Sequence, residues 1–157
     1  ISDPDALIDK KEDSILYEWQ DFSDEYKYGL KSEVRIRNQI PSIQNKINFP
    51  YDVDDEFSQY LSETEFIDIN SDIREQANEI IEGETDYYLA VYKIADWTKT
   101  NIKYDLNTLT AKAVQKSSWV LENKEGVCDE LTNLFISMLR SVGIPARFVT
   151  GTVYTNI

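Results

Sequence analysis

Cys128, with Gly126 two positions before it, is the residue of this sequence best suited to covalent chemistry. Cys128 is the only cysteine among the 157 residues, and the apolar periodicity after it predicts a helix that begins there. The free N–H groups and aligned peptide dipoles of a helix N-terminus stabilise a thiolate, the nucleophilic form of cysteine. Gly126 lets a substrate approach the backbone closely. The pattern therefore predicts a nucleophilic thiol, with the Cys128 N–H available to a tetrahedral oxyanion.

The same residues also fit other roles. Free cysteine is among the most buried residue types, and the carboxylates of Asp129 and Glu130 disfavour a thiolate beside them. The sequence contains no histidine, which is the usual base for a cysteine nucleophile. From these residues alone, a catalytic cysteine, a structural cysteine, and a redox or modification site all stay open.

The composition limits the partners. The formal net charge of −13 repels phosphate backbones, so we expect no nucleic-acid partner. No apolar stretch is long enough to span a bilayer. A single cysteine without histidine, and no calcium-loop pattern among the carboxylates, predict neither a metal site nor a cofactor. An acidic chain that starts without Met and has no further cysteine favours a secreted or cell-surface location over a cytoplasmic one.

The texture of the chain changes near residue 70. Before it, alternating segments predict strands at residues 14–22, 28–38 and 42–50, followed by a partly helical connector over 50–70. After it, the helical period dominates. We therefore expect a strand-rich N-terminal region over residues 1–69 and a core over residues 70–157.

Four helices are expected in the core. One covers residues 71–83 and stops at Gly83, and a short one lies between residues 109 and 126. Another covers 85–102, is capped by Thr85 or Asp86, and is expected to bury Tyr88, Val91, Tyr92, Ala95 and Ile102. The clearest follows Cys128 and buries Leu131, Leu134, Phe135, Met138, Leu139 and Val142. Gly143 suits the left-handed position after a helix, Pro145 prevents continuation, and residues 146–154 alternate as a strand. Strands, helices and a final strand are an α+β order.

The stretch GVCDELTNLFISMLRSVGIPARFVTGTVY, residues 126–154, resembles the core of the transglutaminase-like superfamily of papain-type cysteine enzymes. In that family a Gly-x-Cys opens the central helix, which leads through Arg-x-x-Gly-Ile-Pro-Ala-Arg into a strand that contains a glycine. The matching positions here are Gly126, Cys128, Arg140, Gly143, Ile144, Pro145, Ala146, Arg147 and Gly151. Residues 94–108 are similar to the family's helix that ends in a Tyr-Asp pair, here Tyr104 and Asp105. The resemblance implies a papain-like α+β core with helices packed on an antiparallel sheet, truncated at its C-terminal sheet.

The resemblance also implies a Cys-His-Asp triad, of which only Cys128 maps onto this sequence. The family's His and Asp lie on the strands that follow, so the absence of histidine marks a truncation. Trp119 is a candidate oxyanion donor, because some members use an upstream indole N–H, although a Trp packed at the helix junction is the more common case. Arg140 and Arg147 are expected to brace the turn after the helix, and Tyr104 and Asp105 to fix the end of theirs.

The function implied is that of a cysteine peptidase, amidase or acyltransferase that acts on protein or peptide amides through a thioester. The chain by itself is expected to be inactive. The alternative is a non-catalytic interaction or structural domain that keeps the fold. Because the strand over 146–154 would lack a neighbour on one side, we also expect dimerisation through its exposed edge.

Overall fold

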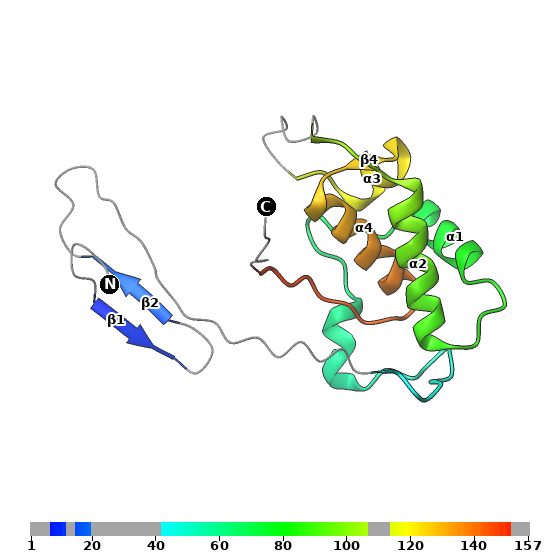
Figure 1. Cartoon of the computed structure of the whole chain (residues 1–157), viewed down its shortest axis with the longest axis horizontal. Coiled ribbons are helices and arrows are strands. Elements are labelled where there is room, and N and C mark those ends of the chain that lie inside the picture. Colours follow the sequence, from blue (N-terminus) through cyan, green and yellow to red (C-terminus); the bar gives the residue numbers. More distant parts are fainter. Residues whose placement is uncertain (1–6, 12–14, 20–41, 107–113, 152–157) are drawn as a thin grey trace. The chain divides into compact units, whose positions relative to one another are not determined.

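The computed structural model describes residues 7–11, 15–19, 42–106 and 114–151. The chain divides into two compact units, an N-terminal unit of residues 1–42 and a core unit of residues 43–157. Figure 1 shows the described elements of each unit. Residues 43–69 therefore lie in the same compact unit as the helices that follow them. A domain boundary at 69/70 stays a prediction.

The described part of the N-terminal unit is an antiparallel hairpin of β1 (Leu7–Lys10) and β2 (Ile15–Glu18). Leu7 pairs with Glu18 and Lys10 with Ile15. The strand expected at 14–22 is therefore confirmed over Ile15–Glu18. The strand expected at 28–38 lies outside the described residues.

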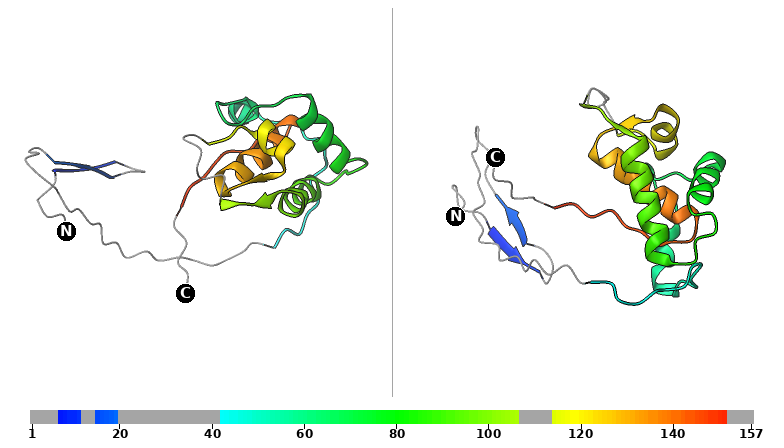
Figure 2. Two further views of the ribbon diagram at one scale, coloured as in Figure 1. Left: turned by 90° about the horizontal axis from the view of Figure 1, so that it is seen from above. Right: turned by 45° about the vertical axis from the view of Figure 1, so that its right-hand side comes forward.

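The core unit is built around α4 (Cys128–Ser141). The helices α1 (Ser71–Ile80), α2 (Tyr87–Asn101) and α3 (Ser117–Asn123) all contact it, as does the 3₁₀ helix η1 (Asp55–Leu61). Figures 1 and 2 show α4 enclosed by its neighbours. The buried hydrophobic cluster contains Ile73, Ala77, Ile81, Ala90, Ile94, Ile102, Val120, Leu121, Leu134, Met138, Leu139 and Ile144. The α+β class is confirmed, and all four expected helices and the helical part of the connector are present.

The helix boundaries follow local chemistry. Asn70 caps α1, because its Oδ1 accepts from the N–H of Ile73 at 2.9 Å. After the C-terminal ends of α1 and α4, Gly83 (φ 69°) and Gly143 (φ 82°) adopt a left-handed backbone conformation, which glycine takes without steric cost. Among the described residues, no helix combines the length and hydrophobicity needed to cross a bilayer.

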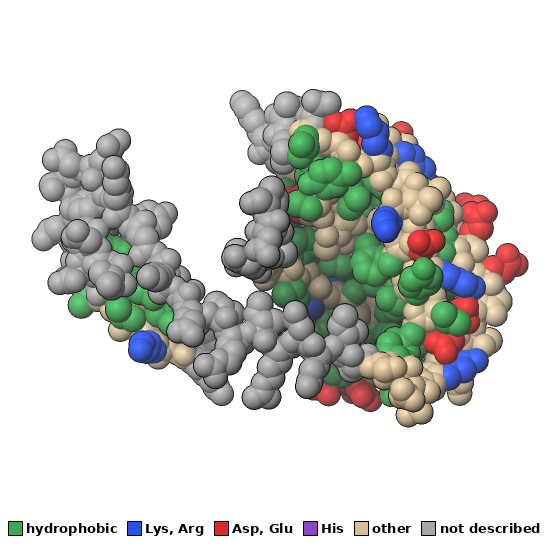
Figure 3. Space-filling view, in the orientation of Figure 1, with side chains coloured by type: hydrophobic (Ala, Val, Ile, Leu, Met, Phe, Trp, Pro, Cys, Tyr) green, Lys and Arg blue, Asp and Glu red, His purple; other side chains and the backbone are tan. Residues whose placement is uncertain are grey.

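The buried face of α2 agrees only in part with the expected one, since Ile102 is buried and Val91 packs against the core as expected. Ala90, Ile94 and Thr98 are buried, whereas Tyr88 and Tyr92 are exposed. The two tyrosines are four positions apart, so they share one face as expected, but that face points to solvent. Figure 3 shows hydrophobic side chains at the surface over α2. A phenol keeps its hydroxyl hydrated there, and the smaller Ala90 lets α2 pack closely.

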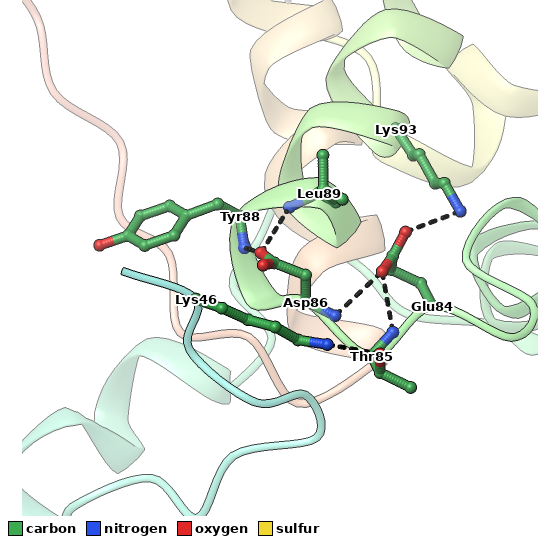
Figure 4. A network of polar contacts seen from close by, with 7 residues as sticks. All are labelled: Lys46, Glu84, Thr85, Asp86, Tyr88, Leu89 and Lys93. Atoms are coloured by element: carbon green, nitrogen blue, oxygen red, sulfur yellow. Dashed lines mark hydrogen bonds and ion pairs between the residues drawn. The ribbon is translucent and has the colours of Figure 1, made fainter. Parts of the chain in front are cut away.

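The start of α2 is fixed by a polar network (Figure 4). Asp86 caps the helix, since its Oδ1 accepts from the N–H groups of Tyr88 at 2.9 Å and Leu89 at 3.2 Å. One oxygen of Glu84 accepts from the N–H groups of Thr85 (2.8 Å) and Asp86 (2.9 Å), and the other pairs with Lys93 at 2.9 Å. The network therefore holds the loop before α2 in one conformation.

Two expected strands are not formed. Residues 42–50 make a single bridge, Asn48 with Asp86, because their partner is the loop before α2 rather than a strand. Residues 146–151 lie in no strand or ladder within the described ranges. The N–H of Ala146 donates instead to the carbonyl of Tyr60, so the side-chain alternation of this segment does not reflect strand pairing there. Residues 152–154 lie outside the described ranges, and dimerisation through this edge stays a prediction.

Candidate functional site

Cys128 is the first residue of α4 and its side chain is exposed. Val127, in extended conformation, precedes it, and the Val127 carbonyl accepts the helical hydrogen bond from Leu131 at 2.9 Å. Cys128 thus stands at the end of the helix where the backbone N–H groups have no helical acceptor. The position that the sequence predicts for a nucleophile is the one observed, with the thiol open to solvent.

A short parallel ladder holds the turn in front of Cys128. β3 (Lys103–Tyr104) pairs with β4 (Glu125–Gly126), so that Lys103 lies opposite Glu125 and Tyr104 opposite Gly126. The N–H of Asp105 donates to the carbonyl of Gly126 at 3.0 Å. The chain that follows α2 therefore runs beside the turn that carries the cysteine.

This ladder brings Tyr104 to Cys128. The charge of Cys128, partial desolvation and a hydrogen bond with the Cys128 side chain raise the pKa of Tyr104 above 10.0, against the opposing effect of a hydrogen bond with the Cys128 backbone. Sequence reasoning assigned Tyr104 only to the end of its helix. The structure places Tyr104 beside Cys128, and its raised pKa keeps the hydroxyl protonated through the neutral range.

Asp105 pairs with a cation of β3, the strand that it follows. Its Oδ2 lies 2.5 Å from the Nζ of Lys103, and this carboxylate raises the pKa of Lys103. The Lys103 side chain is exposed, whereas that of Asp105 is mostly buried.

Glu130 is the residue that sequence reasoning missed. Its side chain is buried, and its two oxygens accept from the N–H groups of Val127 (2.9 Å) and Gln115 (3.0 Å). The sequence analysis treated it only as a charge unfavourable to a thiolate. A usable signal was present, because Glu three positions after an N-cap is the residue of a capping box.

Gly126 is tightly enclosed. A Cβ added to it would lie 3.1 Å from both Cβ and Oε2 of Glu130 and 3.2 Å from Cδ1 of Leu131. Its backbone needs no positive φ, so the glycine is required by space rather than by conformation. The approach it allows in this structure is that of Glu130 from within the protein.

The end of α4 is braced by Arg140. Its guanidinium is nearly buried and donates to the carbonyl of Ala146 through Nε (3.0 Å) and Nη2 (2.6 Å), and to the carbonyl of Ser62 through Nη1. Burial lowers the pKa of Arg140. Gly143 and Pro145 make the turn between these contacts, while Arg147 and Gly151 are exposed. Arg140 thus ties α4 to the chain on both sides of it.

Two hollows flank α4 at its opposite ends. One, of about 400 Å³, is lined by Tyr104, by α2 residues and by Leu131, Thr132 and Phe135. These last three follow Cys128 by three, four and seven positions and so share its helix face. A larger hollow of about 910 Å³ is lined by residues that include Phe57, Tyr87 and Arg147, near the other end of the helix. Cys128 lines neither hollow, and the smaller one lies nearer to it, because its lining includes Tyr104 and Leu131.

A family model of the transglutaminase-like superfamily matches residues 74–157, which is more than half of the chain. The chain belongs to the transglutaminase-like superfamily. The matched segment contains α2, α3, α4, the β3–β4 ladder and every position of the Gly-x-Cys and Gly-Ile-Pro-Ala-Arg motifs. The resemblance read from those motifs is thereby confirmed.

A solved structure supports the same fold. The crystal structure of a candidate cysteine protease from Cytophaga hutchinsonii is similar with a TM-score of 0.53 and 20% sequence identity. The match covers 60% of this chain and 32% of that protein, so the chain spans about a third of that protein's length. A comparison with the curated proteins found no match.

Trp119 stays a candidate oxyanion donor, as the family resemblance implies. It lies half-buried in α3 and packs against the hydrophobic cluster. The Nζ of Lys124 lies 4.6 Å above the ring of a different tryptophan, Trp97. In the part of the chain that the structure describes, no group of three or more carboxylate or thiol side chains is arranged to hold a metal ion.

Proposed function

We propose that this chain carries the nucleophile of a transglutaminase-like cysteine enzyme that acts on protein or peptide amides. The observation that carries the proposal is the exposed thiol of Cys128 at the N-terminus of α4, inside the segment that matches the family. The smaller hollow, lined by Tyr104 and by the α4 residues one turn after Cys128, is the candidate space for a substrate group. The protein it resembles in fold, from Cytophaga hutchinsonii, is described as a candidate cysteine protease.

The proposed reaction has two stages. The Cys128 thiolate attacks the amide carbonyl carbon, forming a C–S bond and a tetrahedral oxyanion. The Cys128 N–H at the helix end is placed to donate to that oxyanion, with the Trp119 indole as a second candidate donor. The C–N bond then breaks, the amine leaves with a proton, and a thioester remains. Water or a second amine attacks the thioester and releases the thiol, which gives hydrolysis or acyl transfer.

Both stages need a group that carries the proton. The family resemblance implies a histidine oriented by an aspartate, and the 157 residues contain no histidine. We therefore propose that the histidine and aspartate belong to a further part of the protein, and that this chain alone does not turn over substrate. Tyr104 does not replace the histidine, because its raised pKa makes it a poor base at neutral pH.

An activated acyl ester tests the proposal. We expect a longer form of the protein that carries the histidine to release a burst of about one equivalent of leaving group, and the 157-residue chain to release none. Cys128→Ser in the longer form should abolish the burst. Release that persists in Cys128→Ser, or that is absent from the longer form, would contradict a Cys128 acyl-enzyme.

The absence of histidine also favours a second candidate, a non-catalytic domain that keeps the fold for interaction with a protein. The enzyme requires a catalytic histidine elsewhere in the protein, whereas the non-catalytic domain does not. A longer form that has no histidine in the strands after residue 157, and that gives no burst, supports the non-catalytic domain. A burst that depends on Cys128 excludes it.

A further inference from the structure

Glu130 lies directly beneath the turn that carries Cys128. Its side chain is 2% exposed, and both of its carboxylate oxygens are used by backbone donors. Oε2 accepts from Val127, the residue before Cys128, and Oε1 accepts from Gln115, fifteen positions earlier in the chain. One carboxylate therefore joins the N-terminus of α4 to the segment that leads into α3.

This arrangement goes beyond an ordinary helix cap. A cap needs one acceptor for the N–H groups of its own helix and works at the surface, as Asn70 does for α1. Glu130 instead buries a charged group, which is costly unless its oxygens are fully hydrogen-bonded. The second bond, to Gln115, reaches a different segment, so the carboxylate sets where the turn lies as well as satisfying its donor.

Gly126 completes the contact from the other side. A Cβ there would lie 3.1 Å from Glu130 Oε2, so the glycine lets the carboxylate reach the Val127 N–H. Gly126 is in turn held by the β3–β4 ladder opposite Tyr104. The backbone just before Cys128 is thus fixed between the ladder and the buried carboxylate.

We propose that Glu130 is a positioning residue for Cys128, one that holds the thiol and the Cys128 N–H in a single outward orientation. The inference deepens the proposed function, since it takes Cys128 as the nucleophile. Glu130 does not touch the substrate and takes no proton in this role. Its length matters more than its charge, because only a glutamate-sized side chain spans the Val127 and Gln115 donors.

The test compares two variants of the intact chain. Glu130→Asp keeps the charge but shortens the side chain by one methylene. Glu130→Gln keeps the length but removes the charge and replaces one acceptor oxygen with an NH2 donor, so it keeps one of the two hydrogen bonds. The measurement is the second-order rate constant for alkylation of Cys128 by iodoacetamide at pH 7, at a temperature below the onset of unfolding. We expect Glu130→Asp to slow alkylation by at least about threefold, because the displaced Cys128 thiol loses its alignment with the N-terminus of α4. Glu130→Gln should slow it less.

A matched control separates position from stability. Asn70→Ala removes the cap of α1, far along the chain from the thiol, and should lower the melting temperature while leaving the alkylation rate unchanged. An unchanged rate in Glu130→Asp overturns the proposal. So does faster alkylation in Glu130→Gln with wild-type alkylation in Glu130→Asp, since that pattern means charge alone.

Gly126→Ala provides the second route if Glu130→Asp does not fold. The added methyl group would displace the Glu130 carboxylate although position 130 is still a glutamate, and alkylation should slow in the same way. Alkylation needs no enzymatic turnover, so the two proposals fail separately. Slower alkylation with no burst in the longer protein contradicts the enzyme only. A Cys128-dependent burst with wild-type alkylation in both variants contradicts the positioning role only.

Discussion

At the scale of single residues, two side chains define the surroundings of Cys128, one distant from it in the sequence and one close to it. Tyr104 is 24 positions earlier (128 − 104) and reaches the thiol through the β3–β4 ladder. Glu130 is two positions later and reaches under the turn. Tyr104 is exposed, whereas Glu130 is buried.

The contact between Tyr104 and Cys128 predicts a change in titration. The negative charge of Cys128 is the largest cause that raises the pKa of Tyr104 above 10.0. Cys128→Ser removes that charge, and the pKa of Tyr104 should therefore fall back toward 10.0. The measurement is an NMR titration of tyrosine labelled at Cζ. Tyr87, whose pKa is raised mainly by burial, serves as the internal control and should titrate as before. An unchanged Tyr104 curve would contradict the contact.

The same two neighbours show what could be read from the sequence at this scale. The helix start at Cys128 is predicted by the residues next to it, whereas its role as a nucleophile is a proposal that rests on the family resemblance. Glu130 stands at the capping-box position, yet its bond to Gln115 depends on how α3 meets α4. Tyr104 reaches the thiol only because two-residue strands pair, and strands that short leave no periodic signal.

At the scale of elements, α2 shows that a helical period can be correct while its buried face is wrong. Large aromatic residues at 88 and 92 predict one stripe, but the helix buries the smaller residues Ala90, Ile94 and Thr98. The stripe expected on α4 packs on the core as predicted, because three helices enclose α4. The buried face of α4 also contains polar residues that this stripe does not include, namely Glu130, Asn133, Ser137 and Arg140. A helix with one buried face leaves the choice to its tertiary neighbours.

Two substitutions on α2 test this assignment. Ile94 is fully buried and Tyr92, two positions earlier, is 64% exposed. Ile94→Ala should cost about 2–5 kcal/mol in the free energy of unfolding, because it removes buried methyl groups and leaves a cavity. Tyr92→Ala should change it by about 0.5 kcal/mol or less. Urea denaturation of the two variants measures both values, and equal losses would contradict the observed face.

At the scale of the whole molecule, acid stability sets one network against the overall charge. The chain carries 29 Asp and Glu residues against 16 Lys and Arg residues, for a net charge of −13. Protonation of carboxylates on mild acidification therefore relieves repulsion between like charges. Glu84 acts in the opposite direction, since its ion pair with Lys93 and its bonds to two backbone N–H groups exist for the ionised form.

Glu84→Gln isolates that opposing effect. The hydrogen bond with Lys93, followed by those with the N–H groups of Asp86 and Thr85, lowers the pKa of Glu84 from 4.5 to about 2. A carboxyl whose pKa is lower in the folded state stabilises the fold above pH 4.5, and that stabilisation disappears as the pH falls through about 2. The melting temperature of the wild type should therefore exceed that of Glu84→Gln by a constant amount above pH 4.5, and the difference should close toward pH 2. The control is Glu82→Gln, at an exposed glutamate on the preceding turn, which should follow the wild-type profile throughout. Because every other carboxylate is common to the two proteins, a difference that does not depend on pH would mean that Glu84 acts through packing rather than through its charge.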